Sequence, residues 1–362
     1  MTSDKLNGVY FTEEEGVTAE YSQEEIPLFL VQTTTAITKL DEKITHYTNF
    51  STFKNDVKNK GLTVTTDYIE QILLEYGTTE FYVYSIKTNT ALGFTNAITV
   101  SSHLTDVTSV SYVEEAVTNG FTIAEKITAI KNGVLDNAEN GAFRIGYIIP
   151  YGTVHAAVES AENTTAEAAC IASLTTILSG NGNGRICVAL PDENAGIVIG
   201  KCLATPYNED AGFNGVSLSI NESSYNFNAE QMLTLQNLGV LFLREEKRQG
   251  IYQQRIEAAV TTSFKESAND GLLICRRIVD EVLRRIGFEA EGYVKANETA
   301  ENVTELQTAV NGIVNDFVAE QSIIRSGTNL KVSDAGNMKF KISGKITPVR
   351  SVQQIEVNTI LA

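Results

Sequence analysis

The glycine-rich stretch SGNGNGR (179–185) is the segment whose composition comes closest to a phosphate-binding loop. In a dinucleotide-binding protein, such a loop follows a strand and opens a helix. Here the order is reversed, because an alanine-rich helical pattern precedes the glycines and the apolar strand pattern RICVALP (185–191) follows them. No Walker A lysine follows either. We therefore interpret the stretch as a helix end followed by an Asn-Gly turn.

The sequence also offers few residues for histidine-based metal binding or nucleophilic catalysis. His46, His103 and His155 are the only histidines, and none has a second histidine or a cysteine at metal-ligand spacing. The sequence contains neither G-x-S-x-G nor H-E-x-x-H. We therefore expect the histidines to be solvated or to lie in the core, and we expect no metal, no cofactor and no catalytic set.

Two runs of carboxylates could in principle act as an acid and a base. They are Glu13-Glu14-Glu15 and Glu24-Glu25. A glycosidase needs two carboxylates at a fixed separation in a cleft, usually with aromatic side chains for the sugar, and this chain has no tryptophan. We interpret both runs as acidic residues exposed to solvent at the protein surface.

The cysteines and the hydropathy of the chain indicate the cellular compartment in which the protein is made. The four cysteines, Cys170, Cys187, Cys202 and Cys275, are widely spaced among apolar neighbours, which predicts buried free thiols. The first residues lack the apolar core of a signal peptide, and no run approaches the roughly 18 apolar residues of a membrane span. We therefore expect a protein made in a cytoplasm that does not insert into a membrane.

An arginine cluster gives two readings of equal interest. Arg276, Arg277, Arg284 and Arg285 lie off the apolar stripe of one predicted helix, with acidic residues between them. One reading is a solvated helix face with ion pairs between residues four apart. The other is a surface that docks on an acidic partner.

The charge is large and unevenly distributed. The chain of 362 residues has 28 Lys and Arg against 45 Asp and Glu, for a net charge of −17. Residues 1–243 hold 12 basic and 29 acidic residues, whereas residues 244–362 hold 16 of each. Only Arg144 and Arg185 precede residue 244, and the other nine arginines, Arg244 included, lie in residues 244–362. The acidic balance argues against nucleic acid as a partner, and the asymmetry suggests two regions with different surroundings.

The first of these regions alternates helix and strand patterns. Helices are predicted at 65–77, at 122–133 with a capping box and a stop at Gly133, and at 164–180; strands are predicted at 81–86, 143–150 and 185–191. Residues 196–204 fit either state, and the Thr- and Ser-rich stretch 87–110 is predicted as strand and loop. The alternation predicts an α/β domain at 26–225 with a mostly parallel sheet.

The second region differs, because helices come first and strands last. Helices are predicted at 228–239, 270–289 and 299–321, followed by an alternating pattern near 338–342. We therefore expect a C-terminal α+β domain at 226–350. The remaining ends, 1–25 and 351–362, each carry a short β-prone segment, and an isolated terminal strand needs a sheet edge to pair with. The expected arm residues are Val9, Tyr10, Phe11, Ile355, Val357 and Ile360.

The order of segments resembles that of contractile tail sheath proteins from phages and related injection machines. NGVYFTEEEG resembles the opening PGVYVEE of that family, with Asn7 where the family usually has proline. TDYIEQILLEYGTTEFYVYSIKT resembles AvxxFFxNGGxxxYVVRV, and NAEQMLTLQNLGVLFLRE resembles LNxxGINxIRxxxG. The likeness spans nearly the whole chain, although only GKCLATPYNEDAGFNG stands for the family's RTDxxRGVWKAPAG region.

The resemblance implies a structural protein and not an enzyme. Sheath subunits stack as hexameric rings around an inner tube, exchange terminal β arms with adjacent subunits, and contract to drive the tube through a cell envelope. The implied partners are other sheath subunits, the inner tube, the baseplate and the tail terminator. The implied location is the tail of a virion or of an injection particle, assembled in the bacterial host cytoplasm. The α/β domain would face outward, and the four clustered arginines would face the tube.

Two other functions fit the residues alone. The alternation of helix and strand is compatible with a nucleotide- or sugar-binding α/β enzyme, because fold does not imply function. A surface adhesin with an acidic outer domain is the third reading, and the missing secretion signal argues against it.

Overall fold

The computed structural model describes residues 25–33, 42–87, 90–104, 106–115, 120–162, 164–212, 223, 225–248, 251–257, 259–264, 271–294, 299–320, 323–325, 328–335 and 339–349. The predicted arm residues Val9 to Phe11 and Ile355 to Ile360 lie outside this set, as do Glu13 to Glu15 and Glu24. The pairing of the two arms is therefore still a prediction.

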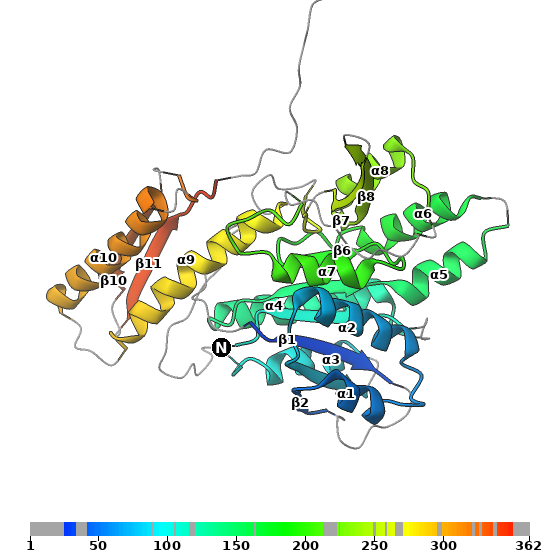
Figure 1. The fold of residues 1–362 in the computed structure, drawn as a ribbon. Coiled ribbons are helices and arrows are strands. Elements are labelled where there is room, and N and C mark those ends of the chain that lie inside the picture. The colour runs from blue at the N-terminus through cyan, green and yellow to red at the C-terminus, as the bar shows by residue number, and fades with distance from the viewer. Residues whose placement is uncertain are drawn as a thin grey trace, which may run out of the picture.

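A seven-stranded sheet in the order β2-β3-β1-β4-β5-β6-β7 forms the body of the molecule (Figure 1). Its strands are β1 Pro27–Gln32, β2 Ile44–Tyr47, β3 Phe81–Ile86, β4 Ser109–Val113, β5 Ile145–Ile149, β6 Ile186–Ala189 and β7 Val240–Leu241. Only β2 runs antiparallel to its neighbour. The predicted α/β domain with a mostly parallel sheet is thus confirmed. Strand β7 pairs with β6, so the sheet extends past residue 225. The division of the chain into domains is still a prediction.

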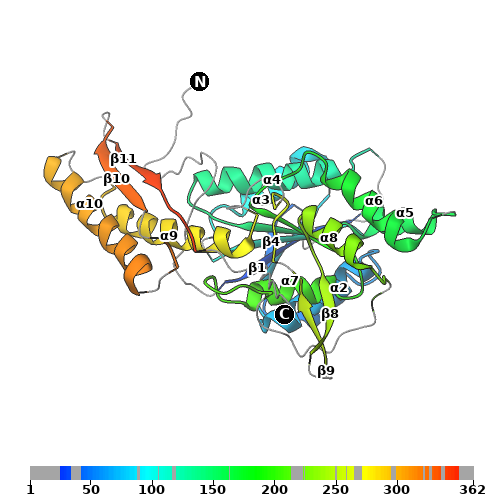
Figure 2. The ribbon, with the colours of Figure 1, turned by 90° about the horizontal axis from the view of Figure 1, so that it is seen from above.

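Helices cover both faces of this sheet (Figure 2). They are α1 Phe50–Asp56, α2 Thr63–Tyr76, α3 Ala91–Val100, α4 Ile123–Glu139, α5 Tyr151–Glu159, α6 Ala166–Leu178, α7 Ala195–Ala204 and α8 Ala229–Asn237. Apolar residues of α3, α4, α6 and α8 pack on one face, and those of α1, α2 and α7 pack on the other. Because strand side chains alternate between faces, Leu28 and Leu30 join the first core, whereas Phe29 and Val31 join the second.

Helices α2 and α7 approach each other unusually closely. A Cβ atom on Gly196 would lie 2.7 Å from the carbonyl oxygen of Tyr68, and one on Gly200 would lie 2.7 Å from that of Ile72. Both distances are shorter than side chains tolerate, so the two glycines, four residues apart on one helix face, allow the helix backbones to touch.

One predicted element type and one predicted helix end are wrong. Residues 91–100 of the supposed strand-and-loop stretch form α3, which begins at the N-cap Thr90 and buries Phe94, Ala97 and Ile98. Helix α4 starts at the predicted Thr122–Glu125 capping box but runs through Gly133 to Glu139. Gly133 does not end the helix; a Cβ atom there would meet the Ile98 side chain at 2.9 Å, so the residue is a close contact between α3 and α4. The ambiguous stretch 196–204 lies in helix α7.

The C-terminal elements lie beside the body (Figures 1 and 2). They are β8 Leu243–Arg248, β9 Ile251–Ile256, α9 Leu273–Glu291, α10 Ala300–Asn315, the π-helical turn Asp316–Glu320, β10 Asn329–Asp334 and β11 Phe340–Lys345. Strands β8 and β9 form one antiparallel pair, and β10 and β11 form another. One apolar core continues from the α2–α7 face of the sheet through α9 to α10 and the β10–β11 pair. The three predicted helices and the final strands are present, but the strands between α8 and α9 were not predicted. The status of these elements as a separate domain is still a prediction.

Candidate functional site

The carboxyl edge of the sheet is the place where α/β enzymes bind ligands, at the point where the strand order reverses. Here that point lies between β1 and β4. After β1 the chain forms the strands on one side of the sheet (β2 and β3), and after β4 it forms those on the other side (β5 to β7). Glu115, which follows β4, accepts hydrogen bonds from the backbone N–H groups of Val64 (2.9 Å) and Thr65 (2.7 Å) in the first turn of α2. Its carboxylate thus occupies the helix N-terminus that would otherwise attract an anion.

The preceding residue occupies a second helix N-terminus. Glu114 accepts a hydrogen bond from the N–H of Thr153 (2.8 Å) in the first turn of α5. Its other oxygen lies 3.5 Å from the ammonium group of Lys126, and both side chains are almost fully buried. Burial lowers the pKa of Lys126, and the Glu114 charge opposes that shift. The two helix N-termini near the switch point are therefore neutralised by the chain's own carboxylates.

The amino edge of the sheet is built in the opposite way, from arginines. Arg185, just before β6, forms a bidentate ion pair with Asp280 of α9, with distances of 2.7 and 2.8 Å. Asp280 also lies 3.3 Å from Nε of Arg276, one turn earlier on α9. Arg185 is fully buried, Arg276 is 4% exposed and Asp280 is 5% exposed. This buried Arg–Asp–Arg cluster ties α9 to the sheet, and its charges are costly to separate.

Two further arginines bind helix C-termini at this edge. Arg277 donates to the carbonyl oxygens of Cys202 (3.1 Å) and Thr205 (2.6 Å) at the end of α7. Arg144, just before β5, donates to the carbonyl oxygen of Ser101, the C-cap of α3, and to that of Leu104 (3.0 Å). Cations are stabilised at helix C-termini by the unpaired carbonyls and the helix dipole. Burial lowers the pKa of Arg144 to about 10.

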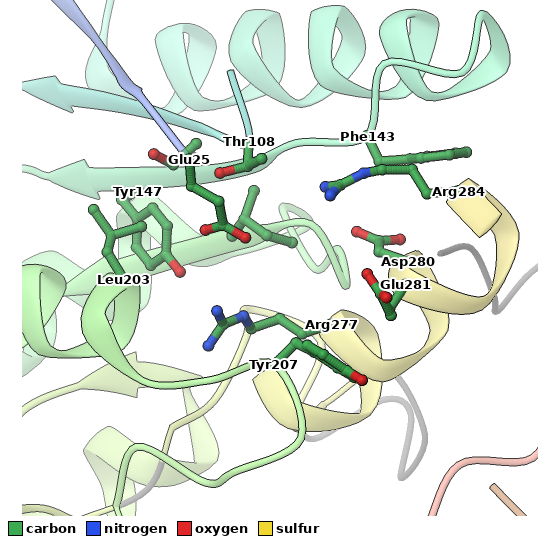
Figure 3. A pocket seen from close by; sticks show the side chains of 12 residues that line it. Glu25, Thr108, Phe143, Tyr147, Leu203, Tyr207, Arg277, Asp280, Glu281 and Arg284 are labelled. Carbon is green, nitrogen blue, oxygen red and sulfur yellow. The ribbon is translucent and has the colours of Figure 1, made fainter. Parts of the chain in front are cut away.

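A small cleft of about 60 Å³ lies between α9 and this edge (Figure 3). Arg277, Asp280, Glu281 and Arg284 line it from α9, and Glu25 lines it from the segment before β1. Burial raises the pKa of Glu281 to about 8, although Arg285 donates to its carboxylate at 2.7 Å. The cleft is too small for a drug-sized or nucleotide ligand, which needs several hundred Å³.

The four arginines predicted as a docking surface are engaged inside the chain. Arg276 and Arg277 have the partners given above, and Arg285 contacts Glu281 and lies 4.7 Å over the ring of Phe317. Burial lowers the pKa of Arg284. The ion pairs between residues four apart are as expected, but the expected solvated face is wrong, because Arg276 and Glu281 are buried. Contact of this cluster with an inner tube is still a prediction.

The antiparallel pair β10–β11, which we call the C-terminal ribbon, is the other notable surface. Its residues Leu330 and Val332 are buried against the core, and Phe340 and Ile342 pack beside them. Its opposite face carries the exposed Lys331, Lys341 and Lys345. A two-stranded ribbon has two outer edges whose backbone groups can accept a further strand.

The remaining candidates have ordinary structural roles. His46 lies 3.2 Å from Glu80 and His155 lies 3.4 Å from Glu159, at the surface. All four cysteines are buried and free, as predicted. The glycine stretch joins α6 to β6 as predicted, and Asn183 bonds to Thr262 there. Among the described residues, no group of acidic, histidine and cysteine side chains could hold a metal ion, and no helix is long and apolar enough to cross a bilayer.

The sequence interpretation missed the buried charges at both edges. Arg144 and Arg185 were noted only as the sole arginines before residue 244. A usable signal was present, since each stands immediately before a strand pattern, in FRIGYII and in RICVAL. Glu114 and Glu115 likewise stand immediately after a strand, where side chains reach the carboxyl edge. The partners Asp280 and Lys126 carry no comparable signal, because their burial depends on tertiary packing.

No protein-family model and no curated protein matches the sequence. Solved structures do match over nearly the full length. A chain of the contracted anti-feeding prophage (AFP) baseplate has a TM-score of 0.66 at 13% identity, covering 100% of both chains. A chain of the contracted sheath complex of the extracellular contractile injection system PVC has a TM-score of 0.64 at 13% identity, covering 99% and 98%. The sheath tail protein Lin1278 from Listeria innocua has a TM-score of 0.59 at 9% identity, covering 92% and 94%.

Proposed function

We propose that this chain, which has the fold of contractile tail sheath proteins, is the protomer of such a sheath. The observation that carries the proposal is the match of the whole chain, from the first strand to the C-terminal ribbon, to chains of contractile particles. At this level of identity the match establishes the fold, and the resemblance of the sequence segments adds the family order. In the proposed assembly the protomers stack as hexameric rings around an inner tube and contract to drive the tube through a target envelope.

The two sheet edges support a structural role over the alternative of a nucleotide- or sugar-binding enzyme. The helix N-termini that would bind a phosphate are occupied by Glu114 and Glu115. The amino edge is filled by the docking of α9 through Arg185 and Asp280. Both edges therefore serve to hold one subunit together, which suits a particle that transmits force.

The proposed partners are other sheath subunits, an inner tube, a baseplate and a tail terminator, in a tail or injection particle assembled in the host cytoplasm. In this assembly the acidic α/β body faces outward and the C-terminal elements face inward. The terminal segments 1–25 and 351–362 exchange with neighbouring subunits. A strand that pairs through its backbone tolerates rotation of the subunits if the linkers flex.

Negative-stain microscopy of the purified full chain tests the proposal. We expect rings or tubes at high protein concentration; persistent monomers would contradict it. Deleting residues 351–362 should abolish polymerisation and leave the body folded, as judged by an unchanged circular dichroism spectrum. Polymers that form unaltered after this deletion would contradict arm exchange.

A further inference from the structure

A groove lies beside β2 and β3, the strands at one end of the sheet (Figure 1). Its volume is about 280 Å³, just below the roughly 300–1,000 Å³ of sites for drug-sized ligands. The residues that line it come from the segment before β2, from β3 and its end, and from α3; they are Glu42, Tyr84, Ile86, Lys87, Gly93, Asn96 and Val100. The groove therefore has room for one small molecule.

The floor and one wall of this groove are apolar. Tyr84 and Ile86, which are 4% and 1% exposed, point from β3 toward α3 and belong to the core on that face of the sheet. On α3, Val100 is 44% exposed at the groove, and Leu92 is 67% exposed two turns earlier on the same side of the helix. Gly93 has no side chain, so a ligand can approach the backbone of α3 there. The groove thus offers apolar surface to one face of a ring-shaped ligand.

Four polar side chains surround this apolar surface. Glu42, Lys87 and Asn96 are exposed at the rim, and Tyr84 contributes its hydroxyl from the floor. None of the four side chains has a hydrogen bond or an ion pair to a residue that the structure describes. The carboxylate can only accept hydrogen bonds, the ammonium group can only donate them, and the phenol and the amide do both. The groove therefore presents donors and acceptors together around one space.

The backbone holds Glu42 in place beside Tyr84. The N–H of Glu42 donates to the carbonyl oxygen of Ser85 (3.1 Å), next to the β2–β3 ladder. Glu42 has a φ of 54°, a conformation that is uncommon for residues other than glycine and that recurs at functional sites. Burial and the nearby Glu42 carboxylate raise the pKa of the Tyr84 hydroxyl. This hydroxyl therefore keeps its proton at neutral pH and can donate a hydrogen bond to a ligand.

We propose that this groove binds a single sugar ring, whose hydroxyls contact the four polar side chains and whose C–H face packs on the apolar surface. Each sugar hydroxyl both donates and accepts, so one ring can pair with acceptors and donors at once. The charges of Glu42 and Lys87 cancel, which favours a ligand without net charge. Glu42 is the only carboxylate among the lining residues, whereas glycoside hydrolysis needs two, so the proposal is binding without catalysis. This activity would be additional to the proposed sheath function.

Saturation-transfer NMR on the purified full chain tests the site. The probes are glucose, galactose, mannose and N-acetylglucosamine, with leucine as a zwitterion that could also match the two charges. A ring of about 12 non-hydrogen atoms with ordinary ligand efficiency binds with a Kd on the order of 1–10 mM, and we expect this for at least one sugar. The absence of binding by every sugar at about 50 mM, or binding by leucine alone, would overturn the proposal.

Two matched substitutions on β3 locate the binding site. Tyr84→Phe removes the hydroxyl in the groove and keeps the ring, so it should raise the Kd about tenfold. Tyr82→Phe is the control, because the Tyr82 hydroxyl, on the same face of the strand, bonds to Asp106 (3.0 Å) outside the groove. This control should change the Kd less than about twofold. Equal effects of the two substitutions would place the sugar elsewhere and overturn the proposal.

Filling the groove is a second, independent test. Gly93→Phe adds a ring from α3 without removing a polar group, so it should abolish binding, whereas Gly93→Ala should leave most of it. Asn96→Ala, at an exposed position, should raise the Kd about threefold even if Gly93→Phe does not fold. Unchanged binding in folded Gly93→Phe, or in Asn96→Ala, would overturn the proposal. These measurements need no polymer, so tubes that bind no sugar refute only this inference, and a sugar-binding chain that forms no tubes refutes only the sheath function.

Discussion

The two edges of the central sheet carry opposite charges for one physical reason. Helices in an α/β layer run antiparallel to the strands, so the carboxyl edge collects helix N-termini and the amino edge collects helix C-termini. Carboxylates of Glu114 and Glu115 serve the first edge. Guanidinium groups of Arg144 and Arg277 serve the second. In this chain, carboxylates close the N-termini of α2 and α5 at the first edge, and the second edge attaches α9.

The largest effect should come from breaking the amino edge. Asp280→Ala leaves Arg185 and Arg276 buried without their carboxylate, so we expect the free energy of unfolding to fall by about 3–5 kcal/mol. Urea denaturation of the monomer measures it. Glu289→Ala, at an exposed position on the same helix, is the matched control and should cost less than about 0.5 kcal/mol. Equal losses in the two variants would refute the buried cluster.

The pH dependence of stability should also come from this edge. The pKa of Glu281 is raised from 4.5 to about 8 by burial, so the folded state retains a proton that the unfolded state releases. The stabilisation contributed by this group is therefore fully present below pH 4.5 and is lost as the pH rises to about 8, by at most about 1.4 kcal/mol per pH unit. Denaturation curves across this range measure the slope. Glu281→Gln should flatten it, and an unchanged slope would assign the proton to another group.

A smaller effect is expected at the carboxyl edge. Glu115→Ala removes the carboxylate from the first turn of α2 and should lower the free energy of unfolding by about 1–2 kcal/mol. The same urea experiment measures it, with Glu139→Ala at the exposed end of α4 as control. If Glu115→Ala left the free energy of unfolding unchanged and also allowed phosphate to bind, the carboxyl edge would be a ligand-binding site that Glu115 blocks. That result would contradict a structural role for Glu115.

The smallest effect should lie away from both edges. Lys54 and Glu70 form an ion pair at 3.0 Å with both side chains about half exposed. Lys54→Ala should cost less than about 1 kcal/mol, and the loss should vanish at high salt. A loss as large as that of Asp280→Ala would mean that burial does not explain the contrast between the edges.

The sequence predicted most of the fold because its local signals agree. The Thr122–Glu125 capping box, the positive-φ Gly77 and the apolar strand runs act within a few residues of the chain. Helix α3 escaped notice because its apolar positions are mixed with Thr and Val, residues more typical of strands. The end of α4 was placed too early, at Gly133, because a glycine that ends a helix cannot be told in the sequence from one that allows two helices to touch.

The candidate site was less predictable, for a different reason. Arg276, Arg277, Arg284 and Arg285 share a helix with a clear apolar stripe, so the sequence places them outside that stripe. It does not show that the sheet edge, about 95 residues earlier at Arg185, covers this face as well. Burial of a charged side chain depends on packing between segments far apart in the sequence, and the hydrophobic periodicity of one helix does not report that packing.

The glycine contacts between α2 and α7 have a mechanical consequence. Two helices whose backbones touch at Gly196 and Gly200 have no side-chain layer between them to deform, so the pair cannot slide or tilt without steric overlap. Force applied at α9 reaches this pair directly, because Arg277 holds the end of α7. A subunit built in this way should be stiff between α9 and α2, so in the proposed sheath a deformation would be concentrated at the contacts between subunits and not inside this body.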